Sequence, residues 1–295
     1  MQARLLAHLS AAIVDATRHS FRVRSATRVV GGDINETFCL EDTKGERYFL
    51  KLNDERHHSM FAAEAAGLDA IAATGALRVP QPVTHGIADG HSYLVLEYLA
   101  LNSRGDARSL GERLAALHRC SNDRFGFARD NFIGSTRQPN NWTADWIAFW
   151  REHRLGFQLQ LAAQNGHGGR LQDLGEQLLE ALPVFFAGYT PQPSLLHGDL
   201  WGGNHAYLAD GTPALFDPAA YYGDRECDLA MTELFGGYSA DFHAAYRAAW
   251  PLDAGYARRR DLYNLYHILN HANLFGGGYA RQAQQMMQRL LAAAA

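Results

Sequence analysis

The stretch that decides the fold runs from Leu195 to Asp228 and reads LLHGDLWGGNHAYLADGTPALFDPAAYYGDRECD. An apolar pair leads into a His-Gly-Asp sequence that ends at Asp199, and Asn204 follows five residues later. A second apolar approach ends at Asp217, and an Asp-Gly pair separates the two short apolar runs, which is a strong hairpin signal. The pattern predicts a loop, a strand, a tight turn and a returning strand. We therefore expect Asp199, Asn204 and Asp217 at one end of that hairpin.

Two carboxylates and a carboxamide on one rim suit phosphoryl transfer, which needs a carboxylate to accept the proton of the attacking hydroxyl and oxygen ligands for Mg²⁺. Asp199 fits the base, and Asn204 and Asp217 fit the metal ligands. Their spacing is that of kinase catalytic loops, although the second Asp lies in Phe-Asp-Pro. A surface turn followed by a capping residue explains any one of the three residues, but not all three at this spacing.

Length and composition exclude several classes of protein. The 295 residues are enough for two lobes, and 47% hydrophobic and 20% charged residues are typical of a globular protein. A formal net charge of −4 argues against a broad nucleic-acid-binding face. No apolar run approaches the roughly 20 residues that span a bilayer. We expect neither a nucleic-acid partner nor a membrane partner.

The cysteines indicate a reducing compartment. There are three, without a C-x-x-C pair, at Cys39, Cys120 and Cys227. The amphipathic N-terminus does not resemble a signal peptide, so we expect a cytoplasmic location. His267 and His271 are four residues apart on a predicted helix, but no third ligand accompanies them, so we expect a polar helix face there and no metal site.

The N-terminal third carries the pattern of a nucleotide-binding flap. Gly31 and Gly32 lie between two predicted strands, and glycines there let backbone N–H groups approach phosphate oxygens. Two glycines alone are a weak signal, because many hairpins contain them. The expected elements are a helix up to about Arg18 and strands over residues 21–30, 37–41 and 47–52.

Lys51 and Glu64 form the next candidate pair. Lys51 ends an aliphatic strand, as a phosphate-contacting lysine does in kinases, although a surface lysine at a strand end would look the same alone. Glu64 lies in an alanine-rich helix thirteen residues later. A carboxylate in so apolar a setting is usually paired, so we predict that it bonds Lys51.

A later strand over residues 93–99 leads into the predicted hinge between lobes. In kinases, main-chain groups there bond adenine, so we assign that contact to Glu97, Tyr98 and Leu99. The sequence then divides into an N-lobe, residues 1–100, with the flap and the Lys/Glu pair, and a C-lobe, residues 101–295, with the catalytic loop and substrate cleft.

The predicted C-lobe is mainly helical. A long loop is expected over residues 126–141, and a helix over 171–182 should stop at Pro183. Trp142 and Trp146 crowd a helix that also carries charges, so this helix either lines a polar-substrate cleft or is a buried face. Asp228 can cap the helix that it begins, and an acid there holds the catalytic loop in kinase-like folds. We give His197 and Asp228 this supporting role.

Four segments together resemble the fructosamine kinase (ketosamine 3-kinase) family, and the bacterial members in particular. The resemblance runs nearly end to end and implies a protein kinase-like fold shared with aminoglycoside phosphotransferases. This is an α+β, bilobal fold with an antiparallel sheet and a helix in a small N-lobe, and a larger helical C-lobe. The segments are HGDLWGGN (197–204), FDPAAYYGDRECDLAM (216–231), GSTRQPNNWTADW (134–146) and LFGGGY (274–279).

The resemblance implies ATP- and Mg²⁺-dependent phosphorylation of the 3-hydroxyl of a ketosamine, a sugar joined to an amine by an Amadori linkage. The product is labile, so the reaction would repair glycation. Trp201 would be a platform for the sugar or its amine carrier. Many relatives have a Cys where this chain has Asp33, which makes a redox-sensitive dimer doubtful, and we favour a monomer. Whether the ketosamine is ribulose-, erythrulose- or fructose-derived, free or protein-bound, stays open.

Two alternatives share parts of this pattern. Aminoglycoside, choline and homoserine kinases have the same Asp/Asn/Asp core, but an aminoglycoside cleft should show a dense acidic lining, which residues 142–154 do not clearly supply. A kinase-shaped binding protein that has lost catalysis should lack at least one of the core residues, and none is missing. The core residues are Lys51, Asp199, Asn204 and Asp217.

Overall fold

A computed structural model describes residues 2–29 and 34–294 of the chain. Gly31, Gly32 and Asp33, which the sequence places in the flap, lie outside the described residues. The chain forms two compact units: unit 1 is Met1–Asp106 with Ala206–Asp217, and unit 2 is Ala107–His205 with Pro218–Ala295. The functional division at residue 100 stays a prediction.

Unit 1 is built on a five-stranded sheet in the order β1-β2-β3-β5-β4, with antiparallel pairing throughout. The predicted strands are present, but the first is shorter than the 21–30 that we expected. The strands are β1 (Ser25–Arg28), β2 (Glu36–Glu41), β3 (Arg47–Asp54), β4 (Pro82–Ala88) and β5 (His91–Glu97).

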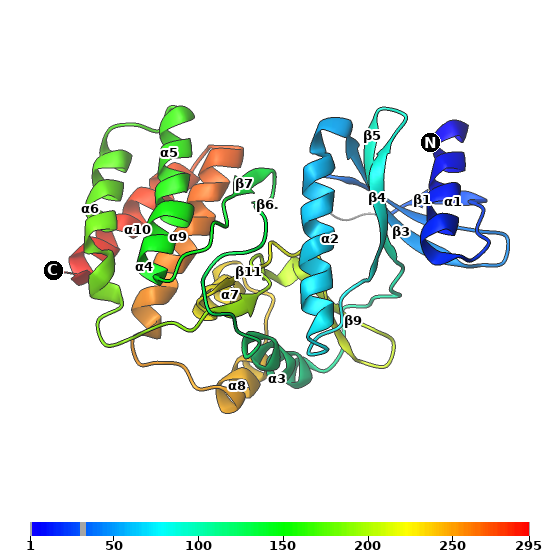
Figure 1. Cartoon of the computed structure of the whole chain (residues 1–295). Helices are drawn as coiled ribbons and strands as arrows, with labels where there is room; N and C mark the ends of the chain where they lie inside the picture. Colours follow the sequence, from blue (N-terminus) through cyan, green and yellow to red (C-terminus); the bar gives the residue numbers. More distant parts are fainter. Residues whose placement is uncertain (1, 30–33, 295) are drawn as a thin grey trace. The chain divides into compact units, whose positions relative to one another are not determined.

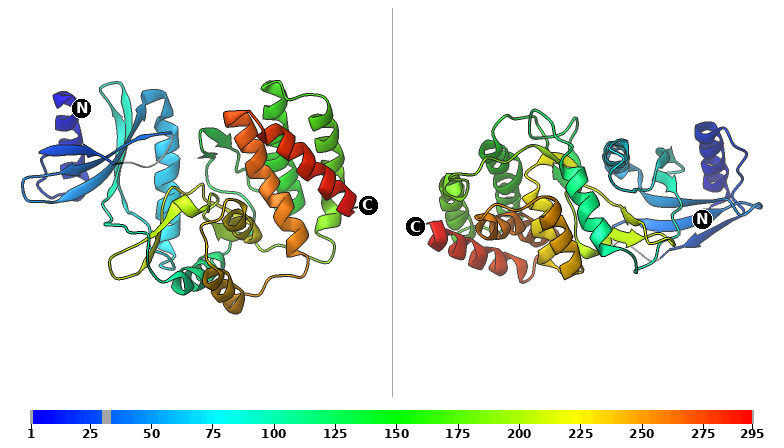
Figure 2. Two further views of the ribbon diagram at one scale, coloured as in Figure 1. Left: turned by 180° about the vertical axis from the view of Figure 1, so that it is seen from behind. Right: turned by 90° about the horizontal axis from the view of Figure 1, so that it is seen from below.

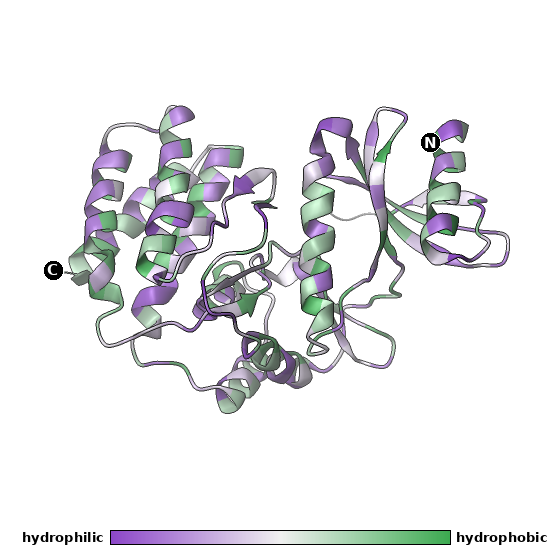
Figure 3. Cartoon of the chain, in the orientation of Figure 1, coloured by the Kyte–Doolittle hydropathy of each residue, from purple (hydrophilic) through white to green (hydrophobic). Residues whose placement is uncertain are grey.

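Two helices cover opposite faces of this sheet (Figure 1). On one face, α1 (Ala3–Thr17) buries Leu5, Leu9 and Ile13 against alternate strand residues such as Leu50. On the other lies α2 (His58–Ala73), which follows a short 3₁₀ turn (Glu55–His57) and is apolar along most of its length (Figure 3). Side chains alternate along a strand, so Lys51, next to Leu50, points to the α2 face.

A small hairpin inserted from the second half of the chain completes unit 1. Its strands are β9 (His205–Tyr207) and β10 (Pro213–Leu215), and Gly211 has a φ of 85° in the turn, which confirms the Asp-Gly hairpin. The N–H of Leu215 donates to the carbonyl of Arg78 at 2.9 Å, which ties the hairpin to unit 1. Asp217 is therefore carried on the same unit as Lys51.

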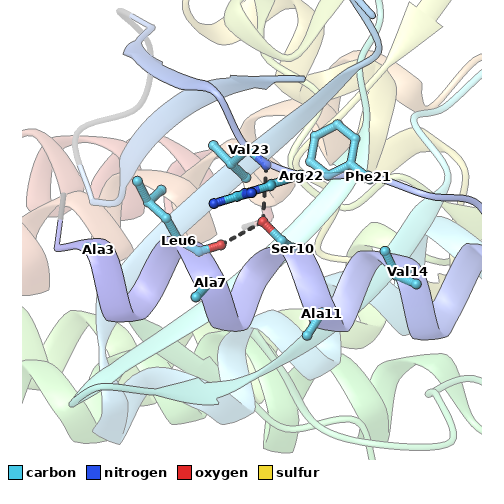
Figure 4. A pocket seen from close by; sticks show the side chains of 9 residues that line it. All are labelled: Ala3, Leu6, Ala7, Ser10, Ala11, Val14, Phe21, Arg22 and Val23. Atoms are coloured by element: carbon cyan, nitrogen blue, oxygen red, sulfur yellow. Dashed lines mark hydrogen bonds between the residues drawn. The ribbon is translucent and has the colours of Figure 1, made fainter. Parts of the chain in front are cut away.

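An open groove runs along α1 (Figure 4). It has a volume of about 530 Å³, and its lining is apolar apart from Ser10 and Arg22. Ser10 Oγ donates to the carbonyl of Leu6 and accepts from the N–H of Val23. The groove lies on the α1 side of the sheet, whereas Lys51 projects from the other face.

Unit 2 is mainly helical. Helices α5, α6, α9 and α10 pack side by side, and α3 packs on α8 (Figure 2). Its helices are α3 (Ala107–His118), α4 (Trp146–Phe149), α5 (Gly156–Gln164), α6 (Arg170–Phe185), α7 (Glu226–Leu234), α8 (Ala240–Ala249), α9 (Tyr256–Phe275) and α10 (Tyr279–Ala294). A π-helical segment (Trp150–Leu155) joins α4 to α5, and η3 (Gly202–Asn204) is a 3₁₀ turn. Two short antiparallel pairs are the hairpin β6 (Asn131–Ile133) with β7 (Thr136–Gln138), and β8 (Ser194–Leu196) with β11 (Tyr221–Gly223), which are far apart in sequence.

Two predictions for unit 2 were wrong. The expected loop over 126–141 contains the β6–β7 hairpin. The helix that should have stopped at Pro183 continues to Phe185, with Pro183 in its last turn. A proline leaves the carbonyl four residues earlier without its helical donor. That carbonyl, of Leu179, accepts hydrogen bonds from the guanidinium of Arg151 instead.

Candidate active site

Lys51 is the centre of the site residues in unit 1. Its Nζ lies 2.6 Å from Oε1 of Glu64 and 2.6 Å from Oδ1 of Asp217. The Lys51 side chain is only 4% exposed, and a buried ammonium needs such partners. The predicted Lys51–Glu64 pair is present, and Asp217 is a second partner that the sequence did not reveal. The sequence contains two lysines, this one and the exposed Lys44 in the turn after β2.

Lys51 remains charged in this environment. Burial opposes the ammonium, but the carboxylates of Asp217 and Glu64 outweigh it and raise the pKa of Lys51 above its ordinary value. Burial also raises the pKa of Glu64, and the charge of Lys51 offsets part of that rise. The cluster therefore presents a fixed positive charge between two acids.

Asp217 has an unusual backbone conformation. Its φ is 57°, in the left-handed region that few residues other than glycine adopt. Strain of this kind persists where the surroundings hold a side chain in place. One carboxylate oxygen bonds Lys51, while the side chain as a whole is 42% exposed. The second oxygen is thus available to a ligand.

In unit 2, the loop from Asp199 to Asn204 folds onto itself. Nδ2 of Asn204 donates to the main-chain oxygen of Asp199 at 2.9 Å and to its Oδ2 at 3.3 Å. The N–H of Asp199 donates to Nδ1 of His197 at 3.3 Å. Because the amide nitrogen of Asn204 is used inside the loop, its Oδ1 is the atom left to meet a cation.

Asp228 holds the start of this loop. Its Oδ2 accepts the N–H of His197 at 2.7 Å and its Oδ1 the N–H of Gly198 at 2.8 Å, while Nε2 of His118 donates to Oδ2 at 3.1 Å. Burial acts to raise the pKa of Asp228, but the bond from His118 and the neighbouring charges and N–H groups lower it below its usual value. Asp228 does not cap α7, because it is the third residue inside that helix; Asp224 Oδ1 accepts the first N–H of α7 instead.

The three candidate tryptophans occupy different settings. Trp201 is 42% exposed and lies over Gly203, where a Cβ would come within 2.1 Å of the indole ring. Trp142 is half-buried before α4, with the guanidinium of Arg124 5.7 Å from its ring. Trp146 is 3% exposed, and its indole N–H donates to the hydroxyl of Tyr263. The buried-face alternative describes Trp146, whereas Trp201 and Trp142 can reach a ligand.

The predicted hinge is partly committed to the fold. The N–H of Glu97 donates to the carbonyl of Gln81 at 2.8 Å, and its carboxylate pairs with Arg78. The Glu97 N–H therefore does not have a free hydrogen for adenine, and a contact through the other main-chain group of Glu97, its carbonyl, stays a prediction. The guanidinium carbon of Arg47 lies over the Tyr98 ring, 4.3 Å from the ring centre. Adenine contacts by Tyr98 and Leu99 stay predictions.

The histidine pair on α9 differs from the expected polar face. His267 is only 6% exposed, and burial lowers its pKa to about 3. His271 Nδ1 donates to the carbonyl of His267, within the helix. Across residues 2–29 and 34–294, no three His, Cys, Asp or Glu side chains gather where they could hold a metal ion. In the same ranges, no helix is long and apolar enough to cross a membrane.

These features define a class. An antiparallel sheet that carries a buried Lys–Glu pair and a mainly helical unit that carries the Asp-x-x-x-x-Asn loop make up the α+β, protein kinase-like fold. An aminoglycoside phosphotransferase crystal structure shares this fold with a TM-score of 0.65 over 99% of each chain, at 12% identity.

Within that class, the chain belongs to the fructosamine kinase family, whose model matches residues 5–293. It is 49% identical to a protein of Synechocystis named "Probable ketoamine kinase", over 95% of this chain and 94% of the relative. It is 41% identical to the chloroplastic protein-ribulosamine 3-kinase of Oryza sativa subsp. indica, over 92% and 80%. A solved structure from Haemophilus somnus 129PT, whose name refers to fructosamine-3-kinase, is 29% identical over 96% of each chain with a TM-score of 0.87.

Proposed function

We propose that this protein uses ATP to phosphorylate the 3-hydroxyl of ketosamines. The observation that carries the proposal is Lys51, held between Glu64 and Asp217 at 2.6 Å from each, in a chain of the fructosamine kinase family. The names of the relatives, ketoamine kinase and protein-ribulosamine 3-kinase, support the substrate class. The labile 3-phosphate product makes the reaction a repair of glycated amines.

The candidate nucleotide residues are assigned their roles one by one. Lys51, oriented by Glu64, bonds phosphate oxygens, and Tyr98 and Leu99 meet adenine. Asn204 Oδ1 and the outer oxygen of Asp217 would hold Mg²⁺, since both are hard oxygen donors with a free lone pair. When bound, the ion neutralises charge on the phosphates.

Asp199 is the base in this proposal. The 3-hydroxyl oxygen bonds to the γ-phosphorus as the bond from that phosphorus to the β–γ bridging oxygen breaks. The hydroxyl proton passes to the Asp199 carboxylate, and ADP leaves with the electron pair. Asn204 and the N–H groups bonded to Asp228 hold Asp199 in place, and Trp201 and Trp142 supply aromatic surface for the sugar and its amine carrier.

The test is ATP turnover at fixed Mg²⁺ with a panel of acceptors. We expect turnover with ribulosamine, erythrulosamine or fructosamine adducts of lysine, and phosphate on the sugar 3-position by NMR. Preferred turnover of an aminoglycoside, choline or homoserine would overturn the substrate class. No transfer to any acceptor, with Mg·ATP bound, would favour a kinase-shaped binding protein.

An ATP acyl-phosphate probe tests the nucleotide site without an acceptor. Such a probe acylates a lysine beside the bound phosphates, and this chain has two lysines to compare. Labelling of Lys51 that excess ATP suppresses supports the site, with the exposed Lys44 as the internal control. Labelling confined to Lys44 would place the phosphates elsewhere.

We also propose that the protein acts as a monomer in the cytoplasm. Cys39, Cys120 and Cys227 are unpaired, which suits a reducing compartment. Light scattering of the purified protein with and without oxidant checks this. A covalent dimer under mild oxidation would contradict the absence of a redox switch.

A further inference from the structure

Three buried carboxamides in unit 2 form a connected group that the mechanism above does not use. We call Asn131, Gln138 and Asn140 the amide cluster; they are 3%, 0% and 1% exposed. Asn131 begins β6, Gln138 ends β7 and Asn140 follows it; the last two lie in the stretch GSTRQPNNW that the sequence singled out. Burying carboxamides costs free energy unless every group is hydrogen-bonded, so their partners show what the cluster holds.

Arg154 fixes the direction of the hydrogen bonds. This arginine is fully buried, and its NH2 donates to Oδ1 of Asn140 at 2.7 Å. A guanidinium can only donate, so the Asn140 oxygen must face it and the Asn140 amide nitrogen must donate onward. That nitrogen donates to Oδ1 of Asn131 at 3.0 Å. The orientation of each amide follows from the one before it.

The hydrogen bonds of the amide cluster end on the main-chain carbonyls of two residues that come shortly after Asp217, the candidate metal ligand, in the sequence. Nε2 of Gln138 donates to Oδ1 of Asn131 at 2.7 Å and to the carbonyl of Ala219 at 3.1 Å. Nδ2 of Asn131 donates to the carbonyl of Ala220 at 2.7 Å. Gln138 therefore donates both of its amide hydrogens, and its Oε1 accepts a hydrogen bond from the hydroxyl of Tyr266 at 2.7 Å.

Ala219 in turn contacts the loop that carries Asp199. Its N–H donates to the carbonyl of His197 at 2.9 Å. Its carbonyl approaches Gly198 so closely that a Cβ there would lie 2.1 Å from the oxygen, and Gly198 has a φ of 83°. The peptide of Ala219 therefore lies between Gln138 on one side and the Asp199 loop on the other.

We propose that Gln138, with the amide cluster behind it, is a positioning residue that fixes the Asp199 loop through the Ala219 peptide. Asp228 holds the N–H groups of His197 and Gly198, and the cluster holds the opposite side of the same loop. The loop is thus clamped by one carboxylate and by neutral amides. The effect of this clamp on catalysis rests on the proposed function, whereas its effect on loop order does not.

Hydrogen–deuterium exchange of the peptide that spans residues 194–205 tests the clamp directly. Gln138→Glu keeps the shape but removes both amide donors and sets a carboxylate oxygen against the Ala219 carbonyl. We expect exchange in this peptide to quicken by about tenfold or more, while peptides from α9 and α10 keep their rates. Gln172→Glu is the matched control, because Gln172 also donates to two main-chain carbonyls, of Leu159 and His167, at a distance from the loop.

Kinetics separate positioning from general support. We expect Gln138→Glu to lower kcat by 10- to 100-fold with KM for ATP within threefold of wild type. A buried carboxyl has a raised pKa and, once protonated, donates one O–H again, so the variant should regain loop protection and activity as the pH falls from 8 to 6. The groups that bond the side chain of residue 138 are the Tyr266 hydroxyl, Asn131 Oδ1 and the Ala219 carbonyl. The charged guanidinium of Arg154 is connected to them through Asn140 and Asn131.

Gln138→Met is the second variant, with similar length and without donors at any pH. It should show the same loss without recovery at low pH. Unchanged exchange of residues 194–205 in both folded variants would overturn the proposal. If exchange quickens in the variants but the wild type phosphorylates none of the ketosamines, the clamp is supported and the proposed function is wrong.

Discussion

The two units hold their site residues by different means. In unit 1, the charged side chain of Lys51 bonds the carboxylates of Glu64 and Asp217 directly. In unit 2, the Asp199 loop is held through its main chain: Asp228 accepts two of its N–H groups, and the amide cluster bonds the Ala219 carbonyl while the Ala219 N–H bonds the loop. The first arrangement has partners that a ligand can replace. The second arrangement consists mainly of bonds to main-chain groups.

This difference separates the steps that each region should control. A phosphate can take the Lys51 ammonium from Asp217, and a cation can take the released carboxylate, so the charged cluster can respond to nucleotide. The Asp199 loop is held by hydrogen bonds within the protein, and preorganised groups act on the transition state. Changes in unit 1 should appear in nucleotide binding, and changes in the loop should appear in kcat.

The largest effect is expected for Asp199→Asn, which removes the proton acceptor and keeps the shape. Transfer should fall by at least about a thousandfold, while Mg·ATP still binds, because the base acts only in the chemical step. Quenched-flow turnover and isothermal titration with a non-hydrolysable ATP analogue measure the two quantities. Turnover close to wild type would remove Asp199 from the mechanism.

Lys51→Met should have the next largest effect, and it tests whether the charged cluster of unit 1 binds nucleotide. It deletes the only cation between Glu64 and Asp217, so kcat/KM for ATP should fall by about 10²- to 10³-fold, the range for removing one electrostatic contact. Lys44→Met is the matched control at an exposed lysine and should stay within twofold. A Lys51→Met enzyme with an unaltered KM for ATP would show that the charged cluster does not bind nucleotide.

Asp217→Ala should have a smaller effect, on Mg²⁺ rather than on folding. One oxygen ligand is lost, and the Mg²⁺ concentration that half-saturates nucleotide binding should rise by about tenfold. Nucleotide fluorescence at varied Mg²⁺ measures it, with Asp241→Asn, an exposed acid on α8, as the control. An unchanged Mg²⁺ titration counts against Asp217 as a ligand.

The last prediction concerns the stability of unit 2 and should leave turnover at neutral pH nearly unchanged. The pKa of His267 is lowered to about 3 by burial, so stability from its neutral form is complete above about pH 6.5 and is lost as the pH falls toward 3. At pH 4.5 this loss is about 3 kcal/mol. Denaturant titrations of wild type and His267→Leu should show a shallower acid slope in the variant. The same slope in both, with exposed His19→Leu as control, would show that His267 does not titrate.

Local signals in the sequence predicted much of this arrangement. The Asp-Gly turn predicted the β9–β10 hairpin, and one acid in an alanine-rich helix predicted the partner of Lys51. Asp217 as a second partner of Lys51 depends on a contact across 166 positions, which no local pattern encodes.

Other parts of the fold and of the site could not be predicted from the sequence, because the same sequence pattern is compatible with two structures. The polar residues of the amide cluster are typical of a loop, and only the fold shows that they are buried. The aromatic residues around Trp146 fit a cleft or a core equally well, and its hydrogen bond to Tyr263 decides for the core. Asp228 bonds the loop, but the first N–H of α7 is accepted by Asp224, since Asp228 is the third residue inside the helix and its carboxylate faces the N–H groups of His197 and Gly198.

The burial of Lys51 affects which lysine of this protein reducing sugars can modify. Reducing sugars attack unprotonated amines, and Lys51 is kept charged and shielded between two acids. The other lysine side chain, Lys44, lies in an exposed turn, and arginines supply the rest of the Lys+Arg total of 27. Lys44 is therefore the lysine side chain of this protein that reducing sugars can readily reach.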